Sequence, residues 1–142
     1  MKFMVIVKAT AESEAGEIGD PALFEAMGRF NEEMIDAGIL LAGEGLQSSA
    51  KGARIRYSRG RYQVTDGPFA ETKELIAGFW IVDVKDKAEC IEWFKKYPFA
   101  EGEEIEIRRV WEASDWEEAG APPEAIEADR RLREKERSRG RP

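Results

Sequence analysis

Two segments of this 142-residue chain are apolar at consecutive positions, and this constrains the fold more than any other feature. The first is FMVIV at residues 3–7, and the second, residues 76–84, contains FWIV at 79–82. Neighbouring side chains of a strand point to opposite faces of its sheet. An unbroken apolar run therefore predicts a strand that is buried on both faces. Each of these two strands needs a cover on either side.

The rest of the chain predicts only two long helices in this domain to supply that cover. Asp20 and Pro21 favour the start of a helix that Gly38 ends. A second helix is expected between Asp86, which with Glu89 resembles a capping box, and Pro98. The residues expected to face the core are Leu23, Met27, Phe30 and Met34 on the first helix, and Ile91, Trp93 and Phe94 on the second.

Alternating apolar and polar residues, together with the two apolar runs, predict six strands. Arg59-Gly60 lies between two alternating segments and predicts a hairpin turn. The order β-α-β, hairpin, β-α-β predicts a ferredoxin-like α+β fold, an antiparallel sheet with both helices on one face. The expected strands cover residues 2–9, 39–42, 53–58, 61–65, 76–84 and 104–111.

Two helices cover only one face of such a sheet, so the second face needs another partner. We expect a homodimer in which two copies join their sheets, because monomers rarely expose so large an apolar patch. A polar residue at Val5 is then expected to weaken both association and folding. The alternative is that the C-terminal segment folds back over the second face.

Composition excludes several functions. The net charge is −7, and a nucleic-acid-binding surface would need to be basic. The chain has no histidine, so it lacks the usual general base and the commonest transition-metal ligand. A single cysteine, Cys90, excludes an internal disulfide and fits a reducing compartment. No apolar run reaches membrane-spanning length, and the start favours a strand over a signal peptide. We expect a soluble, cytoplasmic protein without a cofactor.

The last 29 residues differ from the rest, and we place a boundary between a domain at 1–113 and a C-terminal segment at 114–142. Residues 115–129 contain six acids and no base, whereas residues 130–142 contain seven bases and two acids. The composition after Pro122-Pro123 favours a helix, and its charge order suits the helix dipole. We expect order around Trp111 and Trp116 and a solvated or frayed end.

The stretch DGPFAETKE, residues 66–74, is longer than the turn between two strands requires. Asp66-Gly67-Pro68 alone has the chemistry of a turn. Loops longer than their turn tend to be functional. We expect Phe69 to enter the core and pin the loop, so that charged side chains lie beside a cleft. The candidate ligand-binding residues are Glu44, Gln47, Asp66, Phe69, Glu71, Thr72 and Lys73.

VTDGPFAETKE at 64–74 and AGEGLQ at 42–47 resemble the DGPF-type branch of the YCII-related family, and the match extends over about residues 1–111. The resemblance implies a dimeric α/β-barrel in which two sheets face each other. It implies no established general reaction. Some YCII-like relatives are proposed to use a histidine–aspartate pair, of which only an aspartate, Asp66, remains available here. Relatives often accompany extracytoplasmic-function sigma factors, which implies a regulatory association.

Three functional hypotheses follow. The first is a dimer that binds a small polar ligand in a cleft beside residues 66–74, in a regulatory role. The second is a small enzyme with Asp66 or Glu44 as the base and Lys73 as the electrostatic stabiliser. The third, a site for Mg²⁺ or Ca²⁺ formed by Glu44, Asp66 and Glu71, is the weakest, and we expect no metal. We expect neither nucleic acid nor a membrane as a partner.

Overall fold

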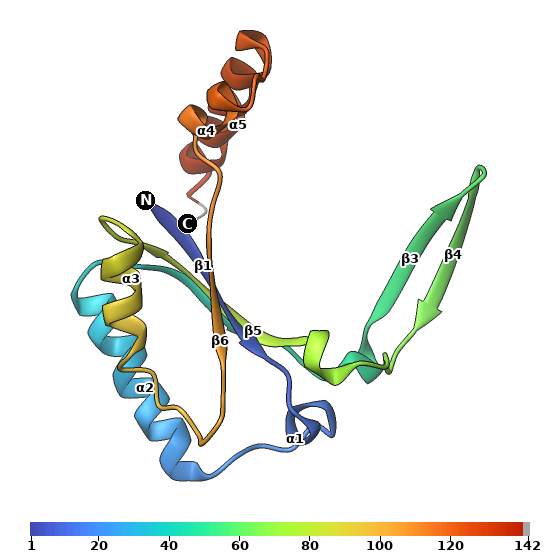
Figure 1. Ribbon diagram of the computed structural model, residues 1–142, viewed down its shortest axis with the longest axis vertical. Coiled ribbons are helices and arrows are strands. Elements are labelled where there is room, and N and C mark those ends of the chain that lie inside the picture. The colour runs from blue at the N-terminus through green and yellow to red at the C-terminus, as the bar shows by residue number, and fades with distance from the viewer. Residues whose placement is uncertain (141–142) are drawn as a thin grey trace.

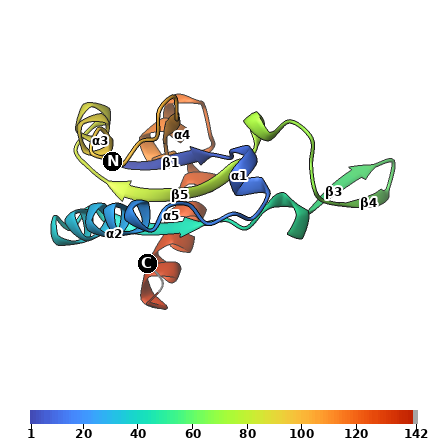
Figure 2. The ribbon, with the colours of Figure 1, turned by 90° about the horizontal axis from the view of Figure 1, so that it is seen from below.

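The computed structural model describes residues 1–140 and their side chains, except the side chain of Lys73. Its main element is a four-stranded antiparallel sheet in the order β2-β5-β1-β6. With its helices on one face, the sheet has the ferredoxin-like arrangement (Figures 1 and 2), which confirms the predicted α+β class. The strands are β1 (Lys2–Lys8), β2 (Leu40–Gly45), β5 (Ile76–Asp83) and β6 (Ile105–Arg109).

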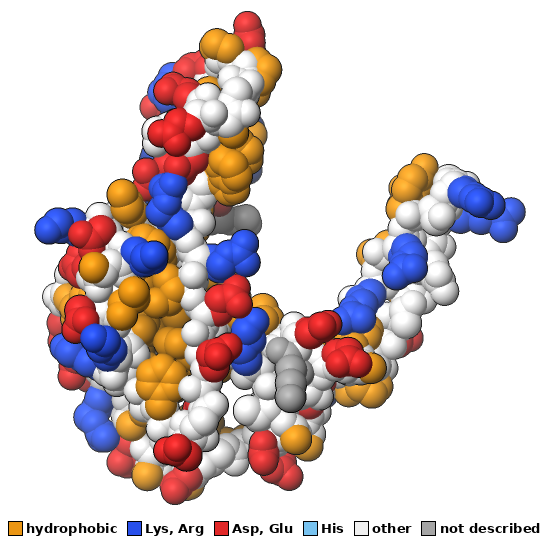
Figure 3. Space-filling model, viewed as in Figure 1, with side chains coloured by type: hydrophobic (Ala, Val, Ile, Leu, Met, Phe, Trp, Pro, Cys, Tyr) orange, Lys and Arg blue, Asp and Glu red, His pale blue; other side chains and the backbone are white. Residues whose placement is uncertain are grey.

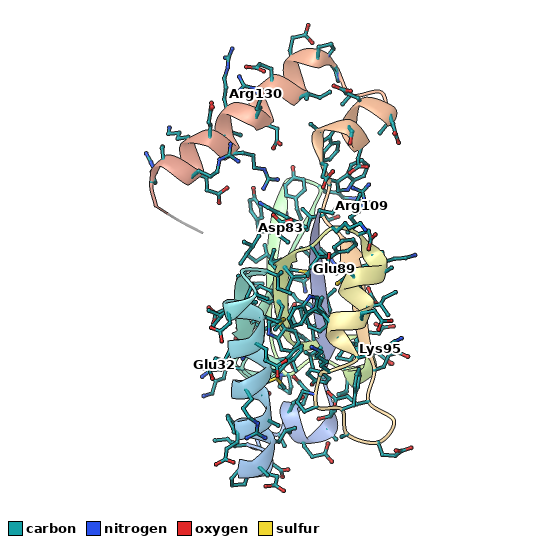
Figure 4. The ribbon with its side chains drawn as sticks, turned by 90° about the vertical axis from the view of Figure 1, so that its left-hand side faces the viewer. Glu32, Asp83, Glu89, Lys95, Arg109 and Arg130 are labelled. Atoms are coloured by element: carbon teal, nitrogen blue, oxygen red, sulfur yellow. The ribbon has the colours of Figure 1, made fainter. Side chains whose placement is uncertain are left out.

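Two helices, α2 (Pro21–Asp36) and α3 (Lys87–Phe94), lie side by side on one face of this sheet (Figure 4). Both begin where the sequence predicts. The Asp20 carboxylate accepts a hydrogen bond from the Ala22 amide at 2.9 Å, and the Asp86 carboxylate accepts one from the Glu89 amide at 2.8 Å. In a capping box, the Glu89 carboxylate would accept a hydrogen bond from the backbone amide of Asp86. Here it accepts one from the Lys85 amide, so the second cap is not a capping box.

The core lies between these helices and the sheet. Four aromatic side chains form its centre with edge-to-face and tilted contacts, namely Phe30, Trp80, Phe94 and Tyr97. The inward face of α3 was predicted only in part. Phe94 is buried and Trp93 packs against the core, but Ile91 is 39% exposed and Cys90 takes the inward position. Leu23, at the start of α2, is likewise exposed rather than buried.

The opposite face of the sheet, called here the open face, is also apolar. The register pairs Met4 with Ile81 and Ile6 with Phe79, and all four side chains are half-buried. Val5 is paired with Trp80 and is fully buried beneath the helices. Val5 was therefore wrongly chosen to probe pairing through the open face. Met4 and Ile6, its two neighbours, belong to that face because side chains alternate along a strand.

The predicted hairpin forms a second, two-stranded sheet that projects from the body, and we call residues 53–66 the hairpin arm (Figures 1 and 2). It consists of β3 (Ala53–Ser58) and β4 (Arg61–Asp66). Its turn uses positive φ angles of 53° at Arg59 and 77° at Gly60, as a type I′ hairpin requires. Every residue of the arm's strands is exposed.

Three short helices join these elements. The segment between β1 and α2 contains α1 (Ala11–Glu14), which Thr10 and Ser13 cap reciprocally. The loop after β2 contains η1 (Ser49–Lys51), and the DGPFAETKE loop ends in η2 (Thr72–Glu74). These single turns lack the long periodic pattern by which a helix can be recognised in a sequence.

The C-terminal segment forms α4 (Ala113–Glu118) and α5 (Pro123–Ser138), which lie beyond the end of the sheet (Figures 1 and 4). It therefore does not fold back over the open face of its own chain. The region around Trp111 and Trp116 is ordered as predicted, since the two rings stack with their centres 4.1 Å apart. None of the helices in the described part of the chain is long and apolar enough to cross a membrane.

Candidate functional site

The DGPFAETKE loop is held against η1 rather than against the core. The Gly67 amide donates a hydrogen bond to the Gly52 carbonyl at 3.0 Å. A Cβ atom at Gly67 would lie 1.7 Å from the Ser49 carbonyl oxygen, so only glycine fits there. The Phe69 amide donates to the Ser49 hydroxyl at 3.1 Å. The loop and η1 thus form one small unit at the base of the hairpin arm.

Glu14 completes this unit, and the sequence analysis did not identify it. Its carboxylate accepts hydrogen bonds from the Ser49 amide, at 3.0 Å, and from the Ser49 hydroxyl. Its backbone carbonyl accepts from the Ser48 hydroxyl at 2.6 Å. Glu14 therefore links α1 to Ser48 and Ser49, which lie 34 and 35 residues later in the sequence, and through Ser49 to the loop. The only local signal was a glutamate in a polar segment, which does not indicate a distant partner.

The prediction that Phe69 enters the core is wrong. Its ring is half-buried and lies outside the core cluster. The Arg54 guanidinium lies over this ring, 3.9 Å from its centre. A cation above an aromatic face stabilises by about 0.5–1 kcal/mol at an exposed site. Phe69 therefore fastens the loop to the hairpin arm and does not anchor it in the body.

The other predicted loop residues lie on the surface. Asp66 ends β4 and is exposed, as are Gln47 and Glu71. Glu71 adopts φ 65°, a left-handed conformation that is uncommon outside glycine, and Thr72 is half-buried. The side chain of Lys73 lies outside the described residues. The predicted loop residues thus lie on the surface, and whether they bind a ligand stays a prediction.

A cavity of about 250 Å³ lies between α2 and strands β2 and β5, next to the point where the loop enters β5. Apolar and aromatic side chains form most of its wall. At three glycines the backbone itself lines the cavity. Pockets of this composition are typical small-molecule sites. Its lining residues are Val7, Met27, Asn31, Gly43, Glu44, Gly45, Ala77, Gly78, Phe79, Trp80 and Tyr97.

The polar groups of this cavity are already oriented. The Trp80 Nε1–H group donates to the Asn31 Oδ1 atom at 2.9 Å. An indole nitrogen can only donate, so this bond identifies Oδ1 as the accepting end of the Asn31 amide. The Asn31 Nδ2 group is consequently the end that can donate to a bound molecule. Asn31 was not a predicted site residue, because a lone asparagine within a helix carries no recognisable motif.

Tyr97 supplies a second fixed group. Its hydroxyl donates to the Glu103 carboxylate, which also accepts from the Ala100 amide. Burial raises the pKa of Tyr97 well above its ordinary range, and the hydrogen bond to Glu103 and its negative charge add to the rise. Tyr97 therefore stays protonated at neutral pH. Its hydroxyl proton is directed at Glu103, so its oxygen can act as an acceptor.

Glu44 is the one predicted candidate that lines this cavity, but its carboxylate belongs to the other face. The register pairs Glu44 with Phe79 on the open face and Gly43 with Trp80 on the covered face. A Cβ atom at Gly43 would lie 2.8 Å from Trp80 Cδ1, so glycine is needed for the indole to reach its place. The wall at β2 is therefore mainly backbone.

The acidic residues do not form a recognisable metal centre. Among the described residues, no group of three or more histidine, cysteine, aspartate or glutamate side chains is arranged to hold a metal ion. The trio Glu44, Asp66 and Glu71 is thus not brought together as such a group. Glu44 and Asp66, the two candidate bases, are both exposed to solvent.

Comparisons with known proteins add a family and a fold likeness. Residues 1–114 match the YCII-related domain. An uncharacterized protein of Rhizobium meliloti (strain 1021) is 31% identical over 74 residues, which are 52% of this chain and 60% of that protein. The chain thus spans less than two thirds of the length of this relative.

Among solved structures, the chain is similar to the 5-chloro-2-hydroxyhydroquinone dehydrochlorinase of Burkholderia phenoliruptrix AC1100, determined in complex with 2,5-dihydroxybenzoquinone. The TM-score is 0.40 and the sequence identity is 14%, with 79% of this chain and 94% of that chain covered.

Proposed function

This chain belongs to the family of YCII-related domains, and we propose that it binds a small molecule in the cavity between α2 and the β2–β5 edge of the sheet. The observation that carries this proposal is the Trp80–Asn31 hydrogen bond, which orients a polar end in an otherwise apolar and aromatic wall. A bound molecule would place a flat apolar body against Trp80 and an acceptor group toward Asn31 Nδ2.

Binding is favoured over catalysis by the positions of the charged groups. The cavity presents one amide donor, one tyrosine oxygen and backbone atoms, and the candidate bases Glu44 and Asp66 are solvent-exposed. General acid–base catalysis needs a proton-transferring group within hydrogen-bond reach of the reacting atom. Among the side chains that the structure describes, the two candidate bases of the enzyme hypothesis are not shielded from water at this cavity.

The loop at 66–74 has a supporting role in this proposal. It enters β5 directly before Ala77, the first residue of β5 that lines the cavity. Two backbone bonds fix that entry, from the Ala9 amide to the Leu75 carbonyl at 2.9 Å and from the Leu46 amide to the Ala77 carbonyl at 2.7 Å. We propose that Asp66, Glu71 and Lys73 act at the rim, where a polar ligand enters. The sigma-factor association stays a prediction of the resemblance.

We further propose that two copies join through their open faces, as the dimeric barrel of the resemblance implies. The support is the open face itself, on which Met4, Ile6, Phe79 and Ile81 form a continuous apolar surface across two adjacent strands. Contiguous apolar surfaces of this kind mark interaction sites. In this arrangement the ligand cavity lies on the covered face, so each copy keeps its own site.

A matched pair of amide substitutions tests the ligand site. Asn31→Asp keeps an oxygen that accepts from Trp80 Nε1 and replaces the Nδ2 donor with a second oxygen. The control, Gln63→Glu, makes the same change on the exposed face of the hairpin arm. We expect small molecules that raise the melting temperature of the native protein to lose their effect on Asn31→Asp and keep it on Gln63→Glu. Equal shifts on all three proteins would refute the cavity as the site.

A further inference from the structure

The hairpin arm has one apolar face that no described residue of its own chain covers. The register pairs Ile55 with Val64 and Tyr57 with Tyr62, so the four side chains share one face, and each is between 64% and 75% exposed. Two-stranded hairpins are marginally stable by themselves in water. Four large hydrophobic residues on an exposed hairpin therefore indicate a surface that is covered in the working assembly.

The same arm is basic in a chain that is acidic overall. It carries four arginines and one acid, whereas the whole chain has a net charge of −7. Figure 3 shows basic side chains following the arm to its tip, with hydrophobic ones on the side turned toward the body. Arg54 lies over Phe69. Within residues 1–140, the other three arginines, Arg56, Arg59 and Arg61, form no ion pair with a described side chain.

A surface with acidic side chains lies at the start of the C-terminal helices. Trp111 and Trp116 are stacked at an angle of 17° between their rings, yet remain 52% and 37% exposed. Beside them is an open cavity of about 470 Å³ that is lined by Arg109, Val110, Trp111, Asp115, Glu118 and Ala119. Arg109 is paired with Asp115, which leaves Glu118 beside the tryptophan ring as the acid that suits a guanidinium group together with an apolar side chain. We call this surface the tryptophan site.

The acids of the tryptophan site are partly free to bind. Asp115 is paired with Arg109, and this pairing lowers the pKa of Asp115. Glu117 and Glu118, one turn further along α4, form no ion pair among the side chains that the structure describes. Glu118 lines the cavity, so the site offers its carboxylate to an incoming cation beside an exposed aromatic surface, and Glu117 is its neighbour in α4.

We infer that the hairpin arm of one copy docks on the tryptophan site of a second copy. Within one chain the arm and the C-terminal helices project in different directions from the body (Figure 1). The two surfaces are complementary in charge, because one is basic and the other acidic. Both also carry exposed aromatic or aliphatic side chains that could pack together. In a twofold pair each arm meets the partner's site, so the contact forms twice.

This inference goes beyond the ligand-binding proposal and does not depend on it. It also adds a contact that pairing of the open faces alone would not provide. The C-terminal helices then have a function that their position in one chain leaves unexplained, namely to receive the partner's arm.

Charge exchange tests the contact. The double substitution Arg59→Glu and Arg61→Glu reverses the charge at the tip of the arm. The double substitution Glu117→Lys and Glu118→Lys reverses the charge at the tryptophan site. We expect each double variant to weaken self-association by roughly tenfold in analytical ultracentrifugation, since both place like charges opposite each other. A chain that carries all four substitutions should recover an affinity close to the native one. Circular dichroism provides the folding control, because all four positions are exposed.

A mixing experiment decides whether the contact is between copies. Copies with Tyr62→Cys and separately tagged copies with Trp116→Cys are combined and treated with a short bismaleimide. The native Cys90 is buried and its pKa is raised to about 11 by burial and by the charge of Glu89, so it should react slowly. We expect a covalent product that contains one copy of each kind.

Three results would overturn the inference. One is a native protein that is monomeric at micromolar concentration. A second is a set of charge reversals whose effects add up instead of cancelling in the fourfold variant. The third is cross-linking that occurs only within one chain, in a variant carrying both cysteines, and never between mixed copies.

Discussion

The two faces of the four-stranded sheet come from the same strands and differ by a shift of one residue. Phe3 and Val5 point to the covered face and are buried under α2 and α3. Met4 and Ile6 point to the open face and are half-buried. Both sets of side chains are equally hydrophobic. The difference between the faces is therefore not in the strands but in what the rest of the chain supplies to cover them.

This difference shows where the stability of a single chain resides. Burying a large apolar side chain completely contributes roughly 1.5–3 kcal/mol. The covered face receives that contribution within one chain, together with the aromatic contacts of Phe30, Trp80 and Phe94. The side chains of the open face gain the full free energy of burial only when a second surface packs against them. Substitutions on the two faces should accordingly affect folding and association in different proportions.

The largest effect is expected from Phe3→Ala on the covered face. It leaves a cavity beneath the helices, which should lower the free energy of unfolding by about 3–5 kcal/mol in urea titrations. Its neighbour Met4 serves as the matched control on the open face. Met4→Ala should cost clearly less in a dilute, monomeric sample and more when the protein is concentrated. Equal costs at both concentrations would show that the faces do not differ in the way described.

The next effect concerns the open face alone. Ile6→Lys places an unpaired charge where two sheets are proposed to meet, and burying such a charge is costly. We expect dimer affinity in analytical ultracentrifugation to fall by roughly a hundredfold or more, with little change in the far-ultraviolet circular dichroism. Ile35→Lys, on the exposed side of α2, is the control and should leave association unchanged. A native protein that is already monomeric would contradict the premise.

The sequence was sufficient to predict most of the fold because its signals are local. Alternation, apolar runs and caps at Asp20 and Asp86 predicted the six strands and the two helices α2 and α3 that cover the sheet. It could not predict which side of α3 faces the core at Ile91 and Cys90, since an eight-residue helix offers few periods to read. Nor could it predict α1, whose one turn is held by the distant contacts of Glu14.

The candidate site was predicted only in part, for the same physical reason. The loop at 66–74 is conspicuous in the sequence, but its contacts are with η1 and Arg54, which local patterns do not report. Glu44 is among the residues that line the cavity, although its carboxylate lies on the other face, and its role as a ligand-binding residue stays a prediction. Asn31 and Tyr97 reach that cavity from elements far apart in the chain. Only the folded arrangement reveals that they share one wall.

A change of pH should loosen the covered face specifically. Burial, with a smaller contribution from the charge of Glu89, raises the pKa of Cys90 from its ordinary 9.0 to about 11. The unfolded chain therefore releases this proton at lower pH than the folded one. The contribution of Cys90 to the free energy of unfolding is thus fully present below about pH 9 and is lost as the pH rises toward 11. Tyr97, whose pKa is also raised, acts in the same direction. Cys90→Ala should make the loss of stability between pH 9 and 11 shallower in urea titrations.

Truncation after Asp129 asks whether the C-terminal end helps to cover either face. The removed part of α5 is exposed and its ion pairs lie mainly within the helix. Surface ion pairs of this kind contribute little, so the free energy of unfolding should change by less than about 1 kcal/mol. A large drop in the melting temperature would mean that the end of α5 packs on a face of the sheet after all.

The smallest effect is expected at Asp66, which belongs to neither face. Asparagine can also stabilise a turn and tolerates its dihedral angles, so Asp66→Asn should change the free energy of unfolding by less than about 0.5 kcal/mol. Lys73→Met should also spare the fold, since it keeps a flexible stem and removes only the charge. If the loop forms the polar rim of the ligand site, both variants will nevertheless lose stabilisation by ligands that protect the native protein in thermal-shift assays. Variants that respond to every ligand as the native protein does would limit the DGPFAETKE loop to joining the hairpin arm to the sheet.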